Sequence, residues 1–222
     1  MREDDRYGRV VLAGDGFLKP IASPLTAEAV SELKLGDIVT LSGPIVTGRD
    51  DVYIRALEYV DAGKDVPACL KGAVVYHCGP IMKQDASGNW TVVAAGPTTS
   101  ARMNKLGPRF IREFGIRAII GKGGMDGANV EAMKECGCVY LAATGGVAVS
   151  YAEGLGSCSG AEWADLGMAE SMWKFDARRL GPLVVAIDAH GNSLYDQVNE
   201  RVRENLAKRA RGHSGSSSSK FP

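Results

Sequence analysis

Two glycine-rich turns, about one crossover apart between residues 95 and 125, are the strongest guide to the fold of this chain. The first turn, Gly96–Met103, follows the apolar run Trp90–Ala95. The second turn, Gly121–Met125, follows the apolar run Ile116–Ile120. A helical pattern comes after each turn, so the order of elements is that of a βαβα unit. Both turns of such a unit lie at the carboxyl ends of strands, where open α/β sheets bind ligands.

The two turns carry polar side chains that suit an anion. Thr98, Thr99 and Arg102 lie in the first turn, and Lys122 lies in the second. Two hydroxyls, a guanidinium, an ammonium and several glycine amides are therefore expected at one edge of the sheet. All of these groups donate hydrogen bonds to carboxylates or phosphates, so the sequence predicts an anion-binding site there.

Neither of the two common nucleotide-binding motifs fits these turns. A P-loop has four residues between its first glycine and the Gly-Lys pair, followed by Ser or Thr. Here five residues separate Gly115 from Gly121, and Gly123 follows Lys122. In the dinucleotide-binding fingerprint the third glycine would fall on Asp126. The anion is therefore not expected to be a nucleotide phosphate.

The charge balance argues against nucleic acids and membrane surfaces as partners. The chain has 26 Lys and Arg against 26 Asp and Glu, so no overall field attracts a polyanion. The first residues, MREDDRYGRV, contain no apolar signal-peptide core, and no apolar run approaches membrane-spanning length. We therefore expect a cytoplasmic protein.

The length of 222 residues predicts one large domain with short extensions. Residues 1–20 are charged and then glycine-rich, and we treat them as an N-terminal extension. Val198, Val202 and Leu206 recur every fourth residue, which predicts an amphipathic terminal helix. Residues 212–222 are rich in serine and are expected to be disordered. The main domain is therefore expected over residues 21–211.

Local signals predict further elements. Residues 72–78 form a nearly continuous apolar run, which is typical of a strand buried on both faces. Residues 85–89 form a hairpin-like loop, and Gly107 and Gly115 bracket a helix. Residues 173–177 and 183–187 are expected to form two further strands.

Arg49 lies directly before a predicted helix at residues 51–60, for which Asp50 is the expected N-cap. An arginine beside the positive end of a helix dipole suits a carboxylate, and a solvated loop residue is the competing interpretation. Among the histidines, His77 is expected to be a hydrogen-bonded strand residue. His190 is expected in a turn, with its distance from the anion site left open.

The cysteines do not form a recognised metal motif. They are an odd set without a CxxC pair: Cys69, Cys78, Cys136, Cys138 and Cys158. The Cys-Gly-Cys spacing at 136–138 is too short for the usual zinc or cluster sites. Reduced structural thiols are the favoured interpretation, and a cluster held wholly by this chain is the alternative. No metal ligand is therefore expected here.

Along most of its length the sequence resembles the β subunit, or C-terminal domain, of iron–sulfur (class I) fumarases and L(+)-tartrate dehydratases. The resemblance covers roughly Ile21 to Leu194. It rests on short motifs in order: Ser23–Thr26, Leu35–Asp37, Leu41–Gly43, Thr47–Asp50, Gly79–Ile81, Gly96–Met103, Gly121–Met125, Trp163–Met168, Glu170–Trp173, Gly181-Pro182 and Asp188–Asn192. One departure is Tyr53, which stands where the family usually has a histidine.

The resemblance implies a fold and an activity. The fold is a swivelling β/β/α domain of the α/β class, with a central mixed or mostly parallel sheet flanked by helices. The activity is that of one half of a heteromeric hydro-lyase that hydrates fumarate to malate. The resemblance places the [4Fe-4S] cluster on a partner α subunit. An L(+)-tartrate dehydratase β subunit and a non-catalytic carboxylate-binding or scaffold domain are the alternatives.

The resemblance and the chemistry of a dicarboxylate together assign the candidate site residues. Arg49 and Arg102 are expected to clamp the two carboxylates, because guanidinium pairs with carboxylate through two parallel hydrogen bonds. The resemblance points to Thr98 as the base, and Lys122 is expected to assist it. Thr99 and the Gly96 amide complete the substrate-binding set. The competing interpretation is that Thr98 or Thr99 caps the following helix, which is favoured for Thr99, and that Lys122 is a surface residue.

Overall fold

The computed structural model describes residues 18–213. The N-terminal extension expected at residues 1–20 lies outside these residues except for its last three, which belong to the first strand. The tail expected at 212–222 also lies outside them, except for the two residues that end the last helix. None of the described helices is long and apolar enough to cross a membrane.

A seven-stranded mixed sheet forms the centre of the molecule, in the order β1-β2-β3-β6-β7-β9-β8. The strands are β1 (Leu18–Ala22), β2 (Ile38–Thr47), β3 (Val74–Tyr76), β6 (Ala118–Gly121), β7 (Val139–Ala142), β8 (Ser157–Glu162) and β9 (Met172–Ile187). Neighbours from β1 to β7 are parallel, whereas β9 is antiparallel to β7, β8 and β2. Because β9 also pairs with β2, the strands β2, β3, β6, β7 and β9 close on themselves.

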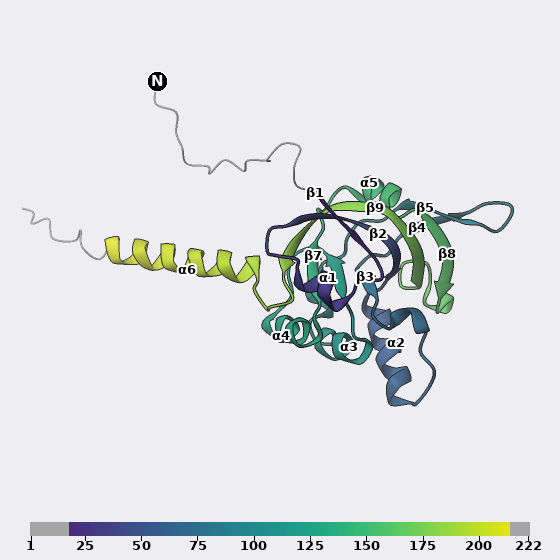
Figure 1. The fold of residues 1–222 in the computed structure, drawn as a ribbon, viewed down its shortest axis with the longest axis horizontal. Coiled ribbons are helices and arrows are strands. Elements are labelled where there is room, and N and C mark those ends of the chain that lie inside the picture. Colours follow the sequence, from purple (N-terminus) through teal and green to yellow (C-terminus); the bar gives the residue numbers. More distant parts are fainter. Residues whose placement is uncertain (1–17, 214–222) are drawn as a thin grey trace, which may run out of the picture.

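Helices flank the sheet on both sides (Figure 1). On one side lie α2 (Asp50–Asp61), α3 (Gly107–Phe114) and α4 (Gly127–Cys136), and on the other lies α5 (Ala148–Gly154). The shorter helices are α1 (Ala27–Ser31), η1 (Ala68–Leu70), η2 (Ser100–Met103) and η3 (Ala164–Leu166). The predicted α/β class, with a mixed central sheet flanked by helices, is confirmed.

The central strands are buried on both faces, as the apolar run at residues 72–78 predicts. In β3, Val74 and Tyr76 join the core between the closed strands and α5, whereas Val75 joins the core beneath α2, α3 and α4. In β6, Ile120 joins the first of these cores and Ile119 joins the second. Successive side chains of a strand point to opposite faces, so each strand supplies both cores.

The apolar run before the first turn does not join this sheet. It forms β5 (Trp90–Ala94), which pairs only with β4 (Ile81–Gln84) in a separate antiparallel hairpin. The predicted βαβα unit is therefore wrong in its first strand, because β3 is the parallel neighbour of β6. Thr91 and Val93 of β5 are exposed, and such one-sided burial suits a hairpin rather than a central parallel strand.

Helix α3 has the boundaries that its end signals predict, since it begins at Gly107 and its C-cap Gly115 has a left-handed φ of 58°. The two strands expected at residues 173–177 and 183–187 are parts of one strand, β9, which contains a residue with a positive φ of 61°, Arg179.

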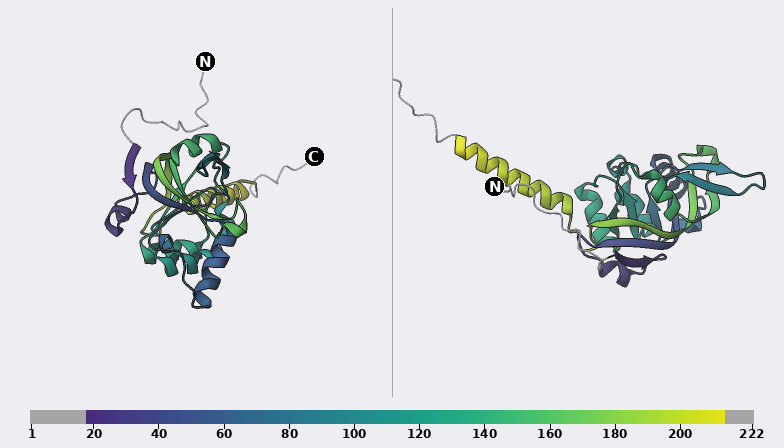
Figure 2. Two further views of the ribbon diagram at one scale, coloured as in Figure 1. Left: turned by 90° about the vertical axis from the view of Figure 1, so that its right-hand side faces the viewer. Right: turned by 90° about the horizontal axis from the view of Figure 1, so that it is seen from above.

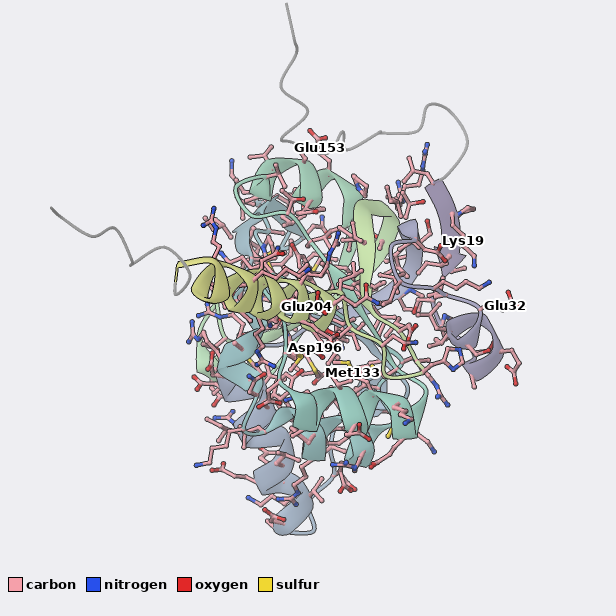
Figure 3. The ribbon with its side chains drawn as sticks, turned by 90° about the vertical axis from the view of Figure 1, so that its left-hand side faces the viewer. Lys19, Glu32, Met133, Glu153, Asp196 and Glu204 are labelled. Atoms are coloured by element: carbon pink, nitrogen blue, oxygen red, sulfur yellow. The ribbon has the colours of Figure 1, made fainter. Side chains whose placement is uncertain are left out.

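The terminal helix is also present, as α6 (Leu194–His213), and it projects away from the body of the molecule (Figure 2). Figure 3 views the molecule from the side on which this helix projects, with Asp196 and Glu204 labelled on it. Its stripe of Val198, Val202 and Leu206 is 49–61% exposed, so these side chains are not part of the core.

Candidate active site

The two glycine-rich turns lie side by side, joined by backbone hydrogen bonds. Thr99 and Lys122 form a parallel bridge, in which the Lys122 amide donates to the Thr98 carbonyl at 3.2 Å. The Ser100 amide donates to the Lys122 carbonyl at 3.0 Å. The turns are therefore brought together as the sequence predicts, although β5, which leads into the first turn, lies in a separate hairpin and not beside β6.

The first turn presents two threonine side chains. Thr98 is partly exposed, and its hydroxyl makes no hydrogen bond to any residue that the structure describes. Thr99 occupies the N-cap position of η2, but its side chain makes no capping hydrogen bond. The expectation that the Thr99 side chain caps the following helix is therefore wrong, and Thr98, one residue earlier, is not a cap either.

Lys122 lies at the end of β6 and is partly exposed. Within residues 18–213, its ammonium takes part in no ion pair. Its Cδ would be 3.7 Å from a Cβ built on Gly145, so the turn after β7 lines the same edge. A cation without a counter-charge, at the carboxyl ends of parallel strands, is free to meet an anionic ligand.

Arg49 occupies the N-cap position of α2 without making a side-chain cap. Its terminal nitrogen lies 3.0 Å from a carboxylate oxygen of Glu170, and both side chains are 20% exposed. Its Nε is buried and has no hydrogen-bond acceptor among the described residues. A buried donor without an acceptor is costly, and an entering carboxylate oxygen would satisfy it.

Arg102 follows in η2 and reaches the beginning of α2. Its guanidinium lies 2.7 Å from Oδ2 of Asp50. The prediction that Asp50 caps α2 is wrong, because Asp50 is the first residue of the helix and its carboxylate pairs with Arg102 instead. This oxygen makes no hydrogen bond, so the contact with Arg102 is an ion pair without hydrogen-bond alignment.

The candidate site gathers three cationic side chains, those of Arg49, Arg102 and Lys122. The carboxylates of Glu170 and Asp50 pair with the two arginines and hold the guanidinium groups near the edge of the sheet. The Lys122 ammonium remains for a ligand. Gly96 lies beside this edge, where an added Cβ would be 3.3 Å from the Cβ of Ala148 in α5. All six predicted site residues thus lie in turns and loops that adjoin one another.

A buried polar chain beneath the turns was missed by the sequence analysis. His77, at the end of β3, lies with Nδ1 2.8 Å from the Ser100 hydroxyl and with Nε2 2.8 Å from the Tyr53 hydroxyl. The Tyr140 hydroxyl donates to the Ser100 hydroxyl at 2.9 Å. His77 is hydrogen-bonded as predicted, although it directly follows β3 and is not part of the strand. The only signal in the sequence for these buried hydrogen bonds was the presence of a histidine and a serine beside glycine turns.

Burial determines the protonation of this histidine. His77 is fully buried, and burial lowers its pKa to about 3. An imidazole is therefore neutral in the folded chain at neutral pH, with one donor and one acceptor for its two partners. In the unfolded chain a histidine titrates near its usual value of about 6.5.

Because of His77, the free energy of unfolding is therefore expected to decrease as the pH decreases. Below about pH 6.5 the unfolded chain binds a proton that the folded chain excludes, so the contribution of His77 is complete above that pH and lost toward pH 3. Between pH 7 and pH 5 the loss in the free energy of unfolding should be about 2 kcal/mol. Urea unfolding measures it, and the loss should shrink in His77→Gln. Equal losses in both proteins would contradict this account.

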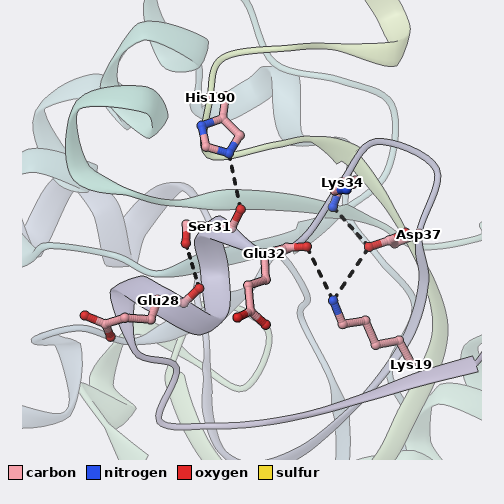
Figure 4. Close-up of polar contacts among 7 residues, drawn as sticks. All are labelled: Lys19, Glu28, Ser31, Glu32, Lys34, Asp37 and His190. Carbon is pink, nitrogen blue, oxygen red and sulfur yellow. Dashed lines mark hydrogen bonds and ion pairs between the residues drawn. The ribbon is translucent and has the colours of Figure 1, made fainter.

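His190 lies away from the candidate site. Its turn follows β9, whose last residue, Ile187, pairs with Tyr140 near the amino end of β7. The His190 ring donates from Nε2 to the carbonyl of Ser31 at 3.2 Å, which ties this turn to the end of α1 (Figure 4). The Lys122 turn lies at the opposite edge of the sheet, so His190 is a turn residue with a structural contact.

The described residues do not offer a ligand set for an iron–sulfur cluster. All five cysteines are free thiols, and burial raises the pKa of each, which disfavours thiolate. Within the described part of the chain, no group of three or more His, Cys, Asp or Glu side chains is arranged to hold a metal ion. A cluster therefore does not fit among these side chains.

Comparison with known proteins identifies the family. The sequence profile described as "Fumarase C-terminus" matches residues 19–198. This chain belongs to the fumarase C-terminus family. All six candidate site residues fall within the part of the chain that the family profile covers.

Three relatives illustrate the range of this family. A Methanocaldococcus jannaschii protein provisionally named L(+)-tartrate dehydratase subunit beta is 43% identical over 82% of this chain and 93% of its own length. The L(+)-tartrate dehydratase subunit beta of Escherichia coli K12 is 34% identical over 79% of this chain and 86% of its own length. A Geobacillus stearothermophilus protein provisionally named fumarate hydratase class I is 40% identical over 85% of this chain, which spans only 35% of that relative.

Proposed function

We propose that this chain is the β subunit of a hydro-lyase that adds water to, or removes it from, a four-carbon dicarboxylate. The observation that carries the proposal is the bridge between Thr99 and Lys122, which places Thr98, Lys122 and Arg102 at one edge. The ion pair between Arg102 and Asp50 brings Arg49, the neighbour of Asp50, to the same edge. The family supports the class of reaction.

The two arginines suit the two carboxylates of such a substrate. Each guanidinium presents planar, paired donors, and neither makes a hydrogen bond to a described residue through these donors. A charged hydrogen bond of this kind contributes about 1.5–3 kcal/mol. Binding at two points fixes the orientation of the carbon atoms between the carboxylates, which removes much of the entropic barrier.

Thr98 and Lys122 suit the proton transfer. Dehydration removes a proton from the carbon next to one carboxylate, while hydroxide leaves from the neighbouring carbon. In our proposal the Thr98 oxygen begins as an alkoxide, takes that proton to become a hydroxyl, and returns the proton in the hydration direction. A threonine hydroxyl is a weak base, so the Lys122 ammonium is needed to stabilise negative charge on the oxygen or on the substrate.

We further propose that a [4Fe-4S] cluster, held by a partner α subunit, completes the site. When bound, such a cluster supplies a Lewis acid for the departing hydroxyl group. The family resemblance implies that the cluster belongs to the partner, and among the described residues no group of three or more His, Cys, Asp or Glu side chains is arranged to hold a metal ion. Two relatives carry the words "subunit beta" in their names, in support of a hetero-oligomer. We also propose that the protein is cytoplasmic, as expected from the sequence.

Fumarate is the substrate of the leading hypothesis, and tartrate is the second candidate. The second candidate is favoured by two of the three relatives above, which are named after tartrate dehydratase. Both substrates are four-carbon dicarboxylates, so Arg49 and Arg102 serve either one. Fumarate has no hydroxyl group and tartrate has two, and pairing with carboxylates does not distinguish them.

The test is to assemble the enzyme from its two halves. The isolated chain should be colourless and should not hydrate fumarate, because it lacks the Lewis acid. After coexpression with a cluster-bearing α subunit and anaerobic reconstitution, the complex should be active. Activity is measured with fumarate, mesaconate and L(+)-tartrate side by side, and the substrate with the highest kcat/KM identifies the enzyme.

Two results would contradict the proposal. Stoichiometric [4Fe-4S] absorbance on the isolated chain after treatment with iron and sulfide would overturn the split site. A complex that contains the cluster but acts on none of the three substrates would leave a carboxylate-binding or scaffold domain as the better description.

A further inference from the structure

We propose that His77 is a positioning residue for this site: through the Ser100 hydroxyl, its imidazole fixes the turn that carries Thr98 against the backbone of Lys122. The inference deepens the proposed function, on which its kinetic test rests. No step of the proposed reaction uses His77, and the residue is fully buried, so it does not touch the substrate.

The backbone around His77 holds the turn on two sides. The His77 carbonyl accepts a hydrogen bond from the Thr98 amide at 2.7 Å, and the His77 amide donates to the Ile120 carbonyl at 2.8 Å. On the other side, Lys122 bonds to both Thr98 and Ser100 through its backbone. The segment 98–100 thus lies between the ends of β3 and β6, held by the residue that directly follows each strand.

The side chain of His77 adds a third attachment. Its Nδ1 lies 2.8 Å from the Ser100 hydroxyl, two residues beyond the Thr98 amide that its carbonyl holds. Ser100 is fully buried, so water does not replace this bond. One residue therefore fixes both ends of the three-residue segment whose first member is the proposed base.

Gly121 leaves the space that this arrangement needs. A Cβ at that position would collide with the Ser100 hydroxyl and would lie 3.1 Å from both His77 Nδ1 and the Tyr140 hydroxyl. The residue before Lys122 must therefore be glycine for Ser100 to reach His77. The position of Lys122 and the position of Thr98 are coupled through this contact.

Two substitutions by amide side chains separate an effect on the position of the turn from an effect on the stability of the fold. In His77→Asn the side-chain amide replaces the Nδ1 side of the ring and can still bond to Ser100, whereas contact with Tyr53 is lost. In His77→Gln the amide reaches the Nε2 side, so contact with Tyr53 is kept and contact with Ser100 is lost. Both changes replace a buried ring, so both should lower the melting temperature.

The proposal predicts different kinetics for these two variants in the reconstituted complex. His77→Gln should lower kcat at least about tenfold with a smaller change in KM, because a displaced base slows the chemical step. His77→Asn should restore most of kcat. Ser100→Ala should match His77→Gln, and the double variant should be no worse than either, since both remove one contact. The matched control is Tyr53→Phe, which keeps the ring stacked on Phe110 and should keep kcat.

A second readout uses the full chain without its partner. Hydrogen exchange of the Thr98 and Ser100 amides reports how firmly the turn is held. Exchange should accelerate at least about tenfold in His77→Gln and Ser100→Ala, and stay near wild type in His77→Asn and Tyr53→Phe. If the wild-type complex is inactive, the proposed function fails while these exchange rates still decide on His77. The inference is overturned if exchange and kcat follow the melting temperature alone, whichever contact is lost.

Discussion

Alanine at Thr98 or at Lys122 is expected to lower kcat of the assembled enzyme by about 10²–10⁴-fold, the range for loss of a positioned proton-transfer group. The structure supports a joint role, because the backbones of Thr98 and Lys122 are hydrogen-bonded to each other. If the ammonium of Lys122 makes the Thr98 oxygen a competent base, neither group works without the other. The double variant should then be only slightly slower than either single variant.

Measurements of stability test whether Thr98→Ala lowers kcat only because it destabilises the fold. Thr99, not Thr98, occupies the N-cap position of η2, so the loss of the Thr98 hydroxyl should leave the melting temperature nearly unchanged. Thr98→Ser keeps the hydroxyl and should keep most of kcat. Lys71→Ala removes an exposed lysine that precedes β3 at the opposite edge, and serves as the control for Lys122→Ala. Full single-turnover chemistry in Thr98→Ala would assign the base to the partner subunit.

The sequence predicted those features of the fold that depend on neighbouring residues. Gly107 and Gly115 mark the ends of α3 because helix ends have local chemical requirements. The continuous apolar run at β3 indicated burial on both faces. The partner of β5 was not predicted, because an apolar run shows that a strand is present but not which strand it pairs with. The available signal for a hairpin was that exposed Thr91 and Val93 alternate with partly buried residues along β5.

The candidate site shows the same division. Its two turns meet as predicted but not for the predicted reason, because β5 is not a parallel neighbour of β6 and the first turn is held instead by backbone bonds to His77 and Lys122. The ion pair between Arg49 and Glu170 joins residues more than a hundred positions apart, which no local pattern reveals. His77 meets Tyr53 and Ser100 over separations of 24 and 23 residues. A single sequence identifies these side chains, and only the folded chain shows that they touch.

Replacement of Arg49 or Arg102 by lysine is expected to lower kcat/KM at least about tenfold, a loss of about 1.4 kcal/mol in transition-state binding. Lysine keeps the charge but has no planar pair of donors, so it cannot bind a carboxylate through two parallel hydrogen bonds. The larger loss should fall on Arg49→Lys, because its buried Nε is a donor that awaits an acceptor. Arg102 is half exposed, so water screens its charge more strongly.

The control is an arginine of the same fold outside the candidate site. Arg109 pairs with Asp61 between α3 and α2, and both side chains are largely exposed. Arg109→Lys should leave kcat/KM unchanged and should alter stability only slightly, because solvent screens surface ion pairs. If Arg49→Lys and Arg102→Lys behave like Arg109→Lys, their ion pairs with Glu170 and Asp50 are structural. The dicarboxylate would then have to be held by Lys122 and the partner subunit.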